Sequence, residues 1–134
     1  MSIKTNGIHH IVITVSDLDR AKAFYMSLLG FTHVTDLGPD RVLLTTGSVM
    51  LAIGLPPDPS QAIDNDRFNE NRVGLDHISF SVESRAELET AVNLFDQHNV
   101  PHGEITDLRP NAPVIFLAFR DPDNIQLELT APAG

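Results

Sequence analysis

Two stretches of the chain repeat one phrase: "GIHHIVITV" at Gly7–Val15 and "GLDHISFSV" at Gly74–Val82. Glycine, histidine, isoleucine and valine recur at the same places in both, and each stretch alternates apolar and polar residues. This alternation is typical of a β-strand with one buried face. His10 matches His77, whereas His9 matches Asp76, so the repeat favours His10 as the functional histidine of the adjacent pair.

Each repeated phrase leads into a helix and then into further strands. Ser16 is the expected N-cap of the first helix and Gly30 its left-handed exit, while Ser84 and Glu87 predict a capping box for the second. Three strand-like runs follow each helix, and both halves therefore have the pattern β-α-β-β-β. These runs are 34–36, 41–46 and 49–54 in the first half, and 103–108, 114–119 and 125–130 in the second.

The repeat predicts an α+β fold with two β-α-β-β-β modules, 7–54 and 74–131, within one domain covering 1–134. Residues 55–73 between them are rich in Pro, Asn and Asp; they form either a linker or a lid over a binding site, and a linker is favoured. We expect the modules to pair, within or between chains, into an incomplete barrel around a shared cup. The open sheet edges favour a homodimer.

The composition excludes several classes of protein. The chain has 134 residues, no cysteine and a net charge of −9, so disulfides, thiolate metal sites and binding to nucleic acid or anionic lipid are not expected. No apolar run approaches the roughly 20 residues that cross a bilayer. The first residues, "MSIKTNG", contain no apolar stretch of the secretory type, and we expect a cytoplasmic protein.

Strand alternation assigns the polar side chains to the cup. Ile13 and Ile78 belong to the apolar face, which places His10 and His77 on the opposite one; Glu128 faces the same way in the last strand. Two imidazoles and one carboxylate suit an open site for one divalent metal ion, which could be zinc, iron, manganese or nickel. An ordinary polar cluster is the alternative.

Three stretches carry a family resemblance: "HHIVITVSDLDRAKAFYMSLLGF", "DHISFSV" and "FRDPDNIQLEL". Together they resemble the vicinal oxygen chelate superfamily, which includes glyoxalases, bleomycin-resistance proteins, fosfomycin-modifying enzymes, methylmalonyl-CoA epimerases and extradiol dioxygenases. The resemblance implies paired β-α-β-β-β modules, a homodimer, and metal ligands at His10, His77 and Glu128. Asn124 stands where the family has the glycine of its "DPDG" turn.

Departures from the family pattern reduce the number of family activities that we expect of this chain. Ala52 occupies the first-module counterpart of Glu128, where glyoxalases and epimerases place a fourth ligand, so these two activities are disfavoured. Ala118 and the 109–113 loop stand where extradiol dioxygenases carry a tyrosine and a histidine, and Val12 replaces a threonine typical of fosfomycin enzymes.

We therefore expect a metal-dependent lyase, isomerase or dioxygenase acting on a small oxygenated substrate that chelates the metal. An extradiol-type iron dioxygenase and a non-catalytic antibiotic-binding protein of the bleomycin-resistance kind are the alternatives. His102 is expected to be an exposed turn residue. The predicted substrate pocket consists of Val12, Thr14, Met50, Ala52, Ser79, Phe116, Ala118 and Gln126.

Overall fold

The chain divides into two units, Met1–Asp66 and Arg67–Gly134, each with one helix and one sheet. The structure is a computed structural model that describes residues 1–134, and each unit is described by itself. The division falls within the segment 55–73, which the sequence gives as the connection between modules. This segment contains only one short 3-10 helix, η1, at Pro59–Gln61.

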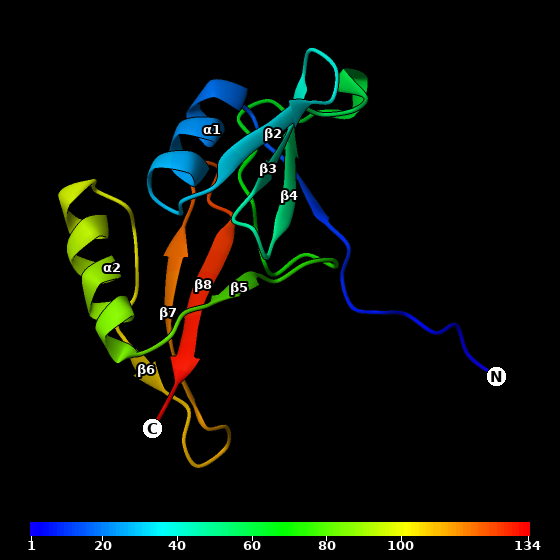
Figure 1. The fold of residues 1–134 in the computed structure, drawn as a ribbon. Coiled ribbons are helices and arrows are strands. Elements are labelled where there is room, and N and C mark those ends of the chain that lie inside the picture. Colours follow the sequence, from blue (N-terminus) through cyan, green and yellow to red (C-terminus); the bar gives the residue numbers. More distant parts are fainter. The chain divides into compact units, whose positions relative to one another are not determined.

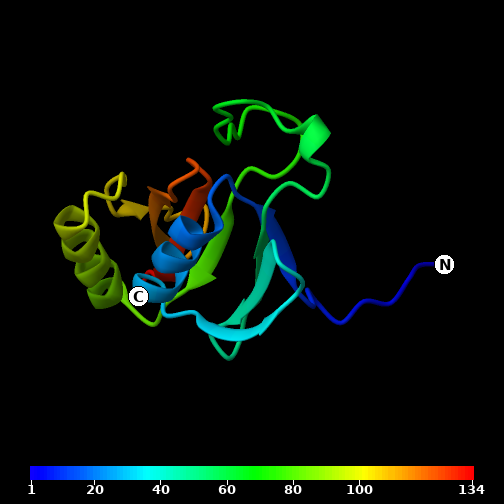
Figure 2. The same ribbon diagram turned by 90° about the horizontal axis from the view of Figure 1, so that it is seen from above.

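The first unit follows the order β-α-β-β-β (Figure 1). Its sheet has the strand order β1-β4-β3-β2, in which β1 and β4 are parallel and the other neighbours antiparallel. Seen from above, the residues before β1 run away from this sheet as an extended segment (Figure 2). The elements are β1 (Ile11–Thr14), α1 (Leu18–Ser27), β2 (Thr32–Asp36), β3 (Arg41–Thr45) and β4 (Met50–Gly54).

The second unit repeats this architecture. Its sheet has the order β5-β8-β7-β6, again with one parallel pair, β5 and β8, and neither sheet closes on itself. The predicted α+β fold with two β-α-β-β-β modules is therefore confirmed. The elements are β5 (Ile78–Ser81), α2 (Arg85–Gln97), β6 (Thr106–Asp107), β7 (Val114–Arg120) and β8 (Gln126–Pro132).

The strand registers show that the two modules are equivalent residue by residue. Val12 lies opposite Ala52 in the first sheet, and Ser79 lies opposite Glu128 in the second. On the other side of the same strands, Leu43 pairs with Ala52 and Ala118 pairs with Glu128. Ala52 is thus the structural counterpart of Glu128, as the sequence repeat predicts.

Burial in the second unit follows the predicted alternation. Helix α2 packs against β7 and β8 with an apolar stripe at helical spacing, and the strands turn alternate residues toward the core. The opposite face keeps Gln126, Glu128 and Thr130 half-buried. The buried residues are Leu88, Ala91 and Phe95 of α2, Ile115, Leu117 and Phe119 of β7, and Leu127, Leu129 and Ala131 of β8.

Two details of the helix ends differ from the sequence prediction. The N-cap of α1 is Asp17, whose carboxylate accepts from the Arg20 amide, whereas the Ser16 hydroxyl accepts from the Arg20 guanidinium. Ser84 is the N-cap of α2, as expected, but its side chain makes no capping hydrogen bond. Gly30 adopts the predicted left-handed conformation, with φ of 74°.

The α-helices, of 10 and 13 residues, are too short to span a bilayer.

Candidate metal centre

His77 and Glu128 face one another in the second unit. His77 immediately precedes β5, which pairs in parallel with β8, so His77 lies on the face that carries Glu128. The Nε2 atom of His77 is 3.5 Å from Oε2 of Glu128. The Glu128 side chain is 16% exposed and that of His77 is 36% exposed. Both side chains are therefore in contact with solvent.

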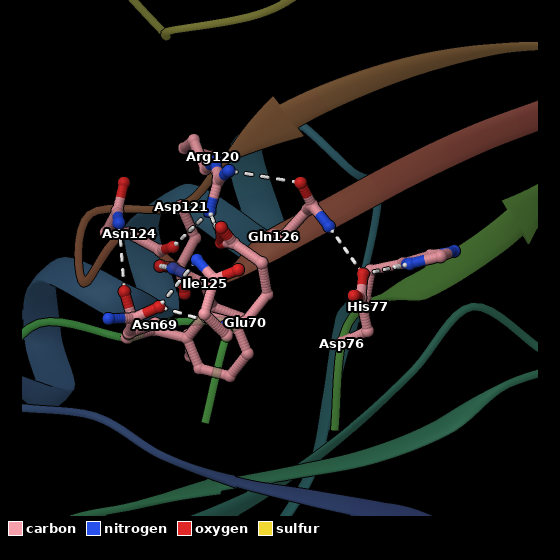
Figure 3. Close-up of polar contacts among 11 residues, drawn as sticks. Asn69, Glu70, Asp76, His77, Arg120, Asp121, Asn124, Ile125 and Gln126 are labelled. Carbon is pink, nitrogen blue, oxygen red and sulfur yellow. Dashed lines mark hydrogen bonds and ion pairs between the residues drawn. The ribbon is translucent and has the colours of Figure 1, made fainter. Parts of the chain in front are cut away.

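Asp76 contacts the other nitrogen of the His77 ring (Figure 3). Its Oδ1 atom lies 2.8 Å from Nδ1 of His77. Both ring nitrogens face a carboxylate, but Asp76 is at hydrogen-bond distance from Nδ1, whereas Glu128 is 3.5 Å from Nε2. An ionised carboxylate can only accept, so the single proton of neutral His77 is favoured on Nδ1. The lone pair of the neutral ring is then on Nε2, which faces Glu128. This is the arrangement of a metal-binding histidine whose second nitrogen donates to a carboxylate.

Gln126 connects Asp76 to Arg120. Its amide nitrogen donates to Oδ1 of Asp76 at 2.7 Å, and its amide oxygen accepts from Nη2 of Arg120 at 3.0 Å. The sequence predicts Gln126 as a pocket residue, and in the structure both ends of its amide are hydrogen-bonded inside the second unit. Arg120 also donates from Nη1 to Glu70 at 2.6 Å, which lowers the pKa of the Glu70 carboxyl.

The C-terminal end of the linker is hydrogen-bonded to the turn between β7 and β8. The Phe68 amide donates to the Asp123 carbonyl at 3.0 Å, and the Asn124 side chain donates to the Phe68 carbonyl at 3.0 Å. Asn124, which stands where the family has a glycine, has a φ of 67°, a left-handed conformation that asparagine adopts more readily than most other non-glycine residues. Buried Asp121 accepts from the amides of Asp123 and Ile125, which fixes the turn (Figure 3).

His10 belongs to the first unit, where it directly precedes β1 as His77 precedes β5. Both His9 and His10 are exposed, and their Nδ1 atoms lie 2.8 Å apart. Within either unit, no three His, Asp or Glu side chains are placed together to hold a metal ion.

The other predicted pocket residues show a range of exposure. Val12, Thr14 and Ser79 are exposed, Met50, Phe116 and Ala118 are half-buried, and Ala52 is only 2% exposed. The hydroxyl of Ser79 is hydrogen-bonded to that of Thr130. The Ser79 hydroxyl is therefore held within the second unit.

His102 is not the exposed turn residue that the sequence predicts. Its side chain is 17% exposed, and the ring lies beside Phe95 with centroids 6.1 Å apart. Nε2 contacts Oδ1 of Asp96 at 2.6 Å and Nδ1 contacts the Gly103 carbonyl at 2.6 Å. Since both nitrogens face acceptors, the charged ring is favoured, and the Asp96 contact in particular raises the pKa of His102.

Comparison with known proteins assigns the family. Residues 7–129 match the Glyoxalase/Bleomycin resistance protein/Dioxygenase superfamily. The chain belongs to this superfamily. The predicted resemblance is thereby confirmed over nearly the whole chain.

Proteins similar to this chain include both uncharacterised and named proteins. The chain is 33% identical to the uncharacterised protein YwkD of Bacillus subtilis, over 92% of this chain and 94% of that protein. It is 30% identical to the metallothiol transferase FosB of Shouchella clausii, over 92% and 79% respectively. Among solved structures, lactoylglutathione lyase from Agrobacterium tumefaciens is 26% identical, with a TM-score of 0.73 and coverage of 96% and 95%.

Of the residues that hold Asp76 and His77 in place, the sequence singles out only Gln126, as a pocket residue. Asp76 directly precedes a predicted metal-binding histidine, which is a usable signal. Arg120 and Glu70 carry no such signal, because their link to the site depends on strand pairing and on the course of the linker.

Proposed function

We propose that the protein is a metal-dependent enzyme of the superfamily that holds one divalent ion through His10, His77 and Glu128. The observation that carries the proposal is the facing pair of His77 Nε2 and Glu128 Oε2 at 3.5 Å, with the other ring nitrogen bound to Asp76. A neutral imidazole lone pair and a carboxylate oxygen are ligands that zinc, iron, manganese and nickel accept. The donor set therefore fits the metal that the family resemblance implies.

His10 is proposed as the third protein ligand from the equivalence of the modules. It stands before β1 as His77 stands before β5, and the register of both strand pairs is the same. Ala52, the counterpart of Glu128, has no donor atom. We therefore propose three protein ligands, which leave positions for substrate.

The proposed substrate is a small oxygenated organic molecule that binds the metal through one or two oxygens. A bound divalent ion would polarise such oxygens as a Lewis acid. The predicted pocket side chains are mainly small or apolar. The name of the similar metallothiol transferase supports a metal-dependent enzyme, and the absence of a fourth ligand at Ala52 disfavours the usual glyoxalase reaction.

Metal analysis of the full chain purified without oxygen tests this proposal. We expect about one divalent ion per chain, lost in His10→Ala, His77→Ala and Glu128→Gln. His9→Ala and His33→Ala are the matched controls, since both are exposed histidines that the proposal excludes from the site. Wild-type protein without metal affinity, or loss of metal in His9→Ala alone, would contradict the ligand assignment.

A substrate screen with and without oxygen then separates the reaction classes. Turnover that requires oxygen identifies a dioxygenase, and oxygen-independent turnover identifies a lyase, isomerase or transferase. Ligand binding without turnover, at full metal occupancy, would contradict an enzyme and favour a binding protein of the bleomycin-resistance kind.

We also propose that the protein is a homodimer. Strands β1 and β2 are the edges of the first sheet, and β5 and β6 are the edges of the second. An unpaired edge strand presents free backbone N–H and C=O groups, with which a second copy of the chain can form hydrogen bonds. Light scattering at micromolar concentration should give the mass of two chains, and a mass of one chain would contradict the proposal.

A further inference from the structure

Four polar side chains of the second unit form one hydrogen-bonded series that ends on His77 (Figure 3). We call Glu70, Arg120, Gln126 and Asp76 the relay. Its contacts are 2.6 Å from Arg120 to Glu70, 3.0 Å from Arg120 to Gln126, and 2.7 Å from Gln126 to Asp76. The last contact, between Asp76 and His77, is 2.8 Å. The relay thus joins the linker to a proposed metal ligand.

The chemistry of Arg120 fixes the direction of every hydrogen bond in the relay. A guanidinium only donates, so Gln126 must turn its amide oxygen to Arg120 and its amide nitrogen to Asp76. The same oxygen of Asp76, Oδ1, accepts from Gln126 and faces Nδ1 of His77. A donor is therefore required at Nδ1, and Nε2 of the neutral ring is left without a proton.

Glu70, which lies in the linker, fixes the position of the Arg120 side chain. Arg120 donates to Glu70 and also to the Asn124 carbonyl at 3.2 Å, and its side chain is half-buried. The neighbouring residue Phe68 is held on the same turn by two hydrogen bonds. The linker segment Phe68–Glu70 is therefore part of the environment that orients Arg120.

The first module shows that the fold does not require the relay. The register places Met50 opposite Thr45, as it places Gln126 opposite Arg120. His9 occupies the place of Asp76 in the repeat. A methionine offers no amide to bridge these positions, so only the second module carries the series.

We propose that the relay residues are positioning residues that hold the Nδ1–H form of His77 and aim Nε2 at the metal beside Glu128. The inference rests on the proposed function, because it assigns these four residues a role at the proposed metal site. It makes the linker segment Phe68–Glu70 a structural part of that site.

Nitrogen-15 NMR of the histidine rings in the metal-free full chain tests the positioning directly. Wild-type His77 should be in the Nδ1–H form, whereas Asp76→Ala should shift it toward the Nε2–H form. Asp76→Asn should restore the wild-type form, because its side-chain oxygen can still accept from both partners. Gln126→Met, which introduces the residue of the first module, should shift the ring in the same direction as Asp76→Ala, but less.

Titration of Zn²⁺ into the same variants measures the consequence for the metal site. Loss of a carboxylate that orients a ligand typically weakens binding about 10–100-fold, and we expect this for Asp76→Ala. For Gln126→Met and Glu70→Gln we expect losses of about three- to tenfold, as these residues act through Asp76. Glu89→Gln is the matched control for Glu70→Gln, since Glu89 forms a solvent-exposed ion pair with Arg85 on α2.

A double variant distinguishes positioning from a general structural role. If Glu70 acts through Asp76, then Glu70→Gln should add nothing to the loss caused by Asp76→Ala. Additive losses, or an unchanged His77 ring in Asp76→Ala and Gln126→Met, would overturn the proposal. If wild-type protein binds no Zn²⁺, the proposed function fails, and the NMR result in metal-free protein still decides whether the relay sets the form of His77.

Discussion

Ala52 and Glu128 occupy the same register position in the two sheets, each in a strand flanked by one parallel and one antiparallel neighbour. One module thus presents a carboxylate where the other presents a methyl group. If the modules share a metal ion, this pair determines whether the site has three or four protein ligands.

The substitution Ala52→Glu should convert the proposed three-ligand site into one with four. We expect metal affinity to rise by about tenfold or more, the metal-bound protein to unfold at a higher temperature, and activity to fall because substrate loses a position. Metal titration and thermal unfolding with and without metal measure these effects.

Ala131→Glu is the matched control for this experiment. Ala131 is also almost fully buried in a strand, but it belongs to the apolar face of β8. A buried unpaired carboxylate there should destabilise the protein whether or not metal is present. If Ala52→Glu behaves in the same way, Ala52 does not face the metal.

Stability should depend on pH through His102. Its pKa is raised by Asp96, so its contribution is fully present below the unfolded-state pKa of about 6.5 and is lost as pH rises through the higher folded-state value. Asp96 is mostly exposed, and we expect an effect on the order of 1 kcal/mol.

Denaturant unfolding of wild type and His102→Gln across this pH range measures the effect. The difference in free energy of unfolding should be largest at low pH and shrink as pH rises. In Asp96→Asn the dependence should flatten. A difference that is independent of pH would show that His102 stabilises the fold only by packing on Phe95.

Replacing Asn124 by glycine should release the linker without disturbing the turn. Glycine adopts the left-handed conformation of Asn124 freely but cannot donate to the Phe68 carbonyl. Hydrogen exchange at the Phe68 amide should therefore be faster in Asn124→Gly. Asn124→Ala should lose the same hydrogen bond and in addition about 1–2 kcal/mol from backbone strain. Unchanged exchange in both variants would show that the Asn124 side chain does not hold the linker.

Shortening Leu127 should cost more stability than the changes at His102 and Asn124. Leu127 is fully buried in β8, and Leu→Ala at such sites typically costs about 2–5 kcal/mol. Leu75→Ala, at a half-exposed position before β5, should change stability by less than about 0.5 kcal/mol. Equal effects in denaturant unfolding would contradict the assignment of the core.

The elements that the sequence predicts correctly are those encoded by local patterns. Alternation identifies β7 and β8, and the repeat identifies Ala52 as the counterpart of Glu128. The N-cap of α1 was wrong by one residue because Ser16 and Asp17 are both good caps, and side-chain geometry selects between them.

The parts that could not be predicted depend on long-range contacts. His102 is half-buried by its contacts with Phe95 and Asp96 at the end of α2. Gln126 reaches Asp76, 50 residues away, only because β5 and β8 pair in parallel in one particular register. Spacing along the chain carries no information about such a contact.

The hydrogen bonds at the two ends of the connection also determine where the chain tolerates insertion. The Leu55 amide donates to the Asp40 carbonyl in the first unit, and Phe68 is fastened to the β7–β8 turn in the second. Between these anchors, Ala62, Ile63 and Asp64 are exposed. A fluorescent tag or a protease cleavage site placed there would leave both anchors intact. Each half of the chain would then keep its own terminal contacts, which makes this stretch the natural place to divide the protein into two complementing fragments.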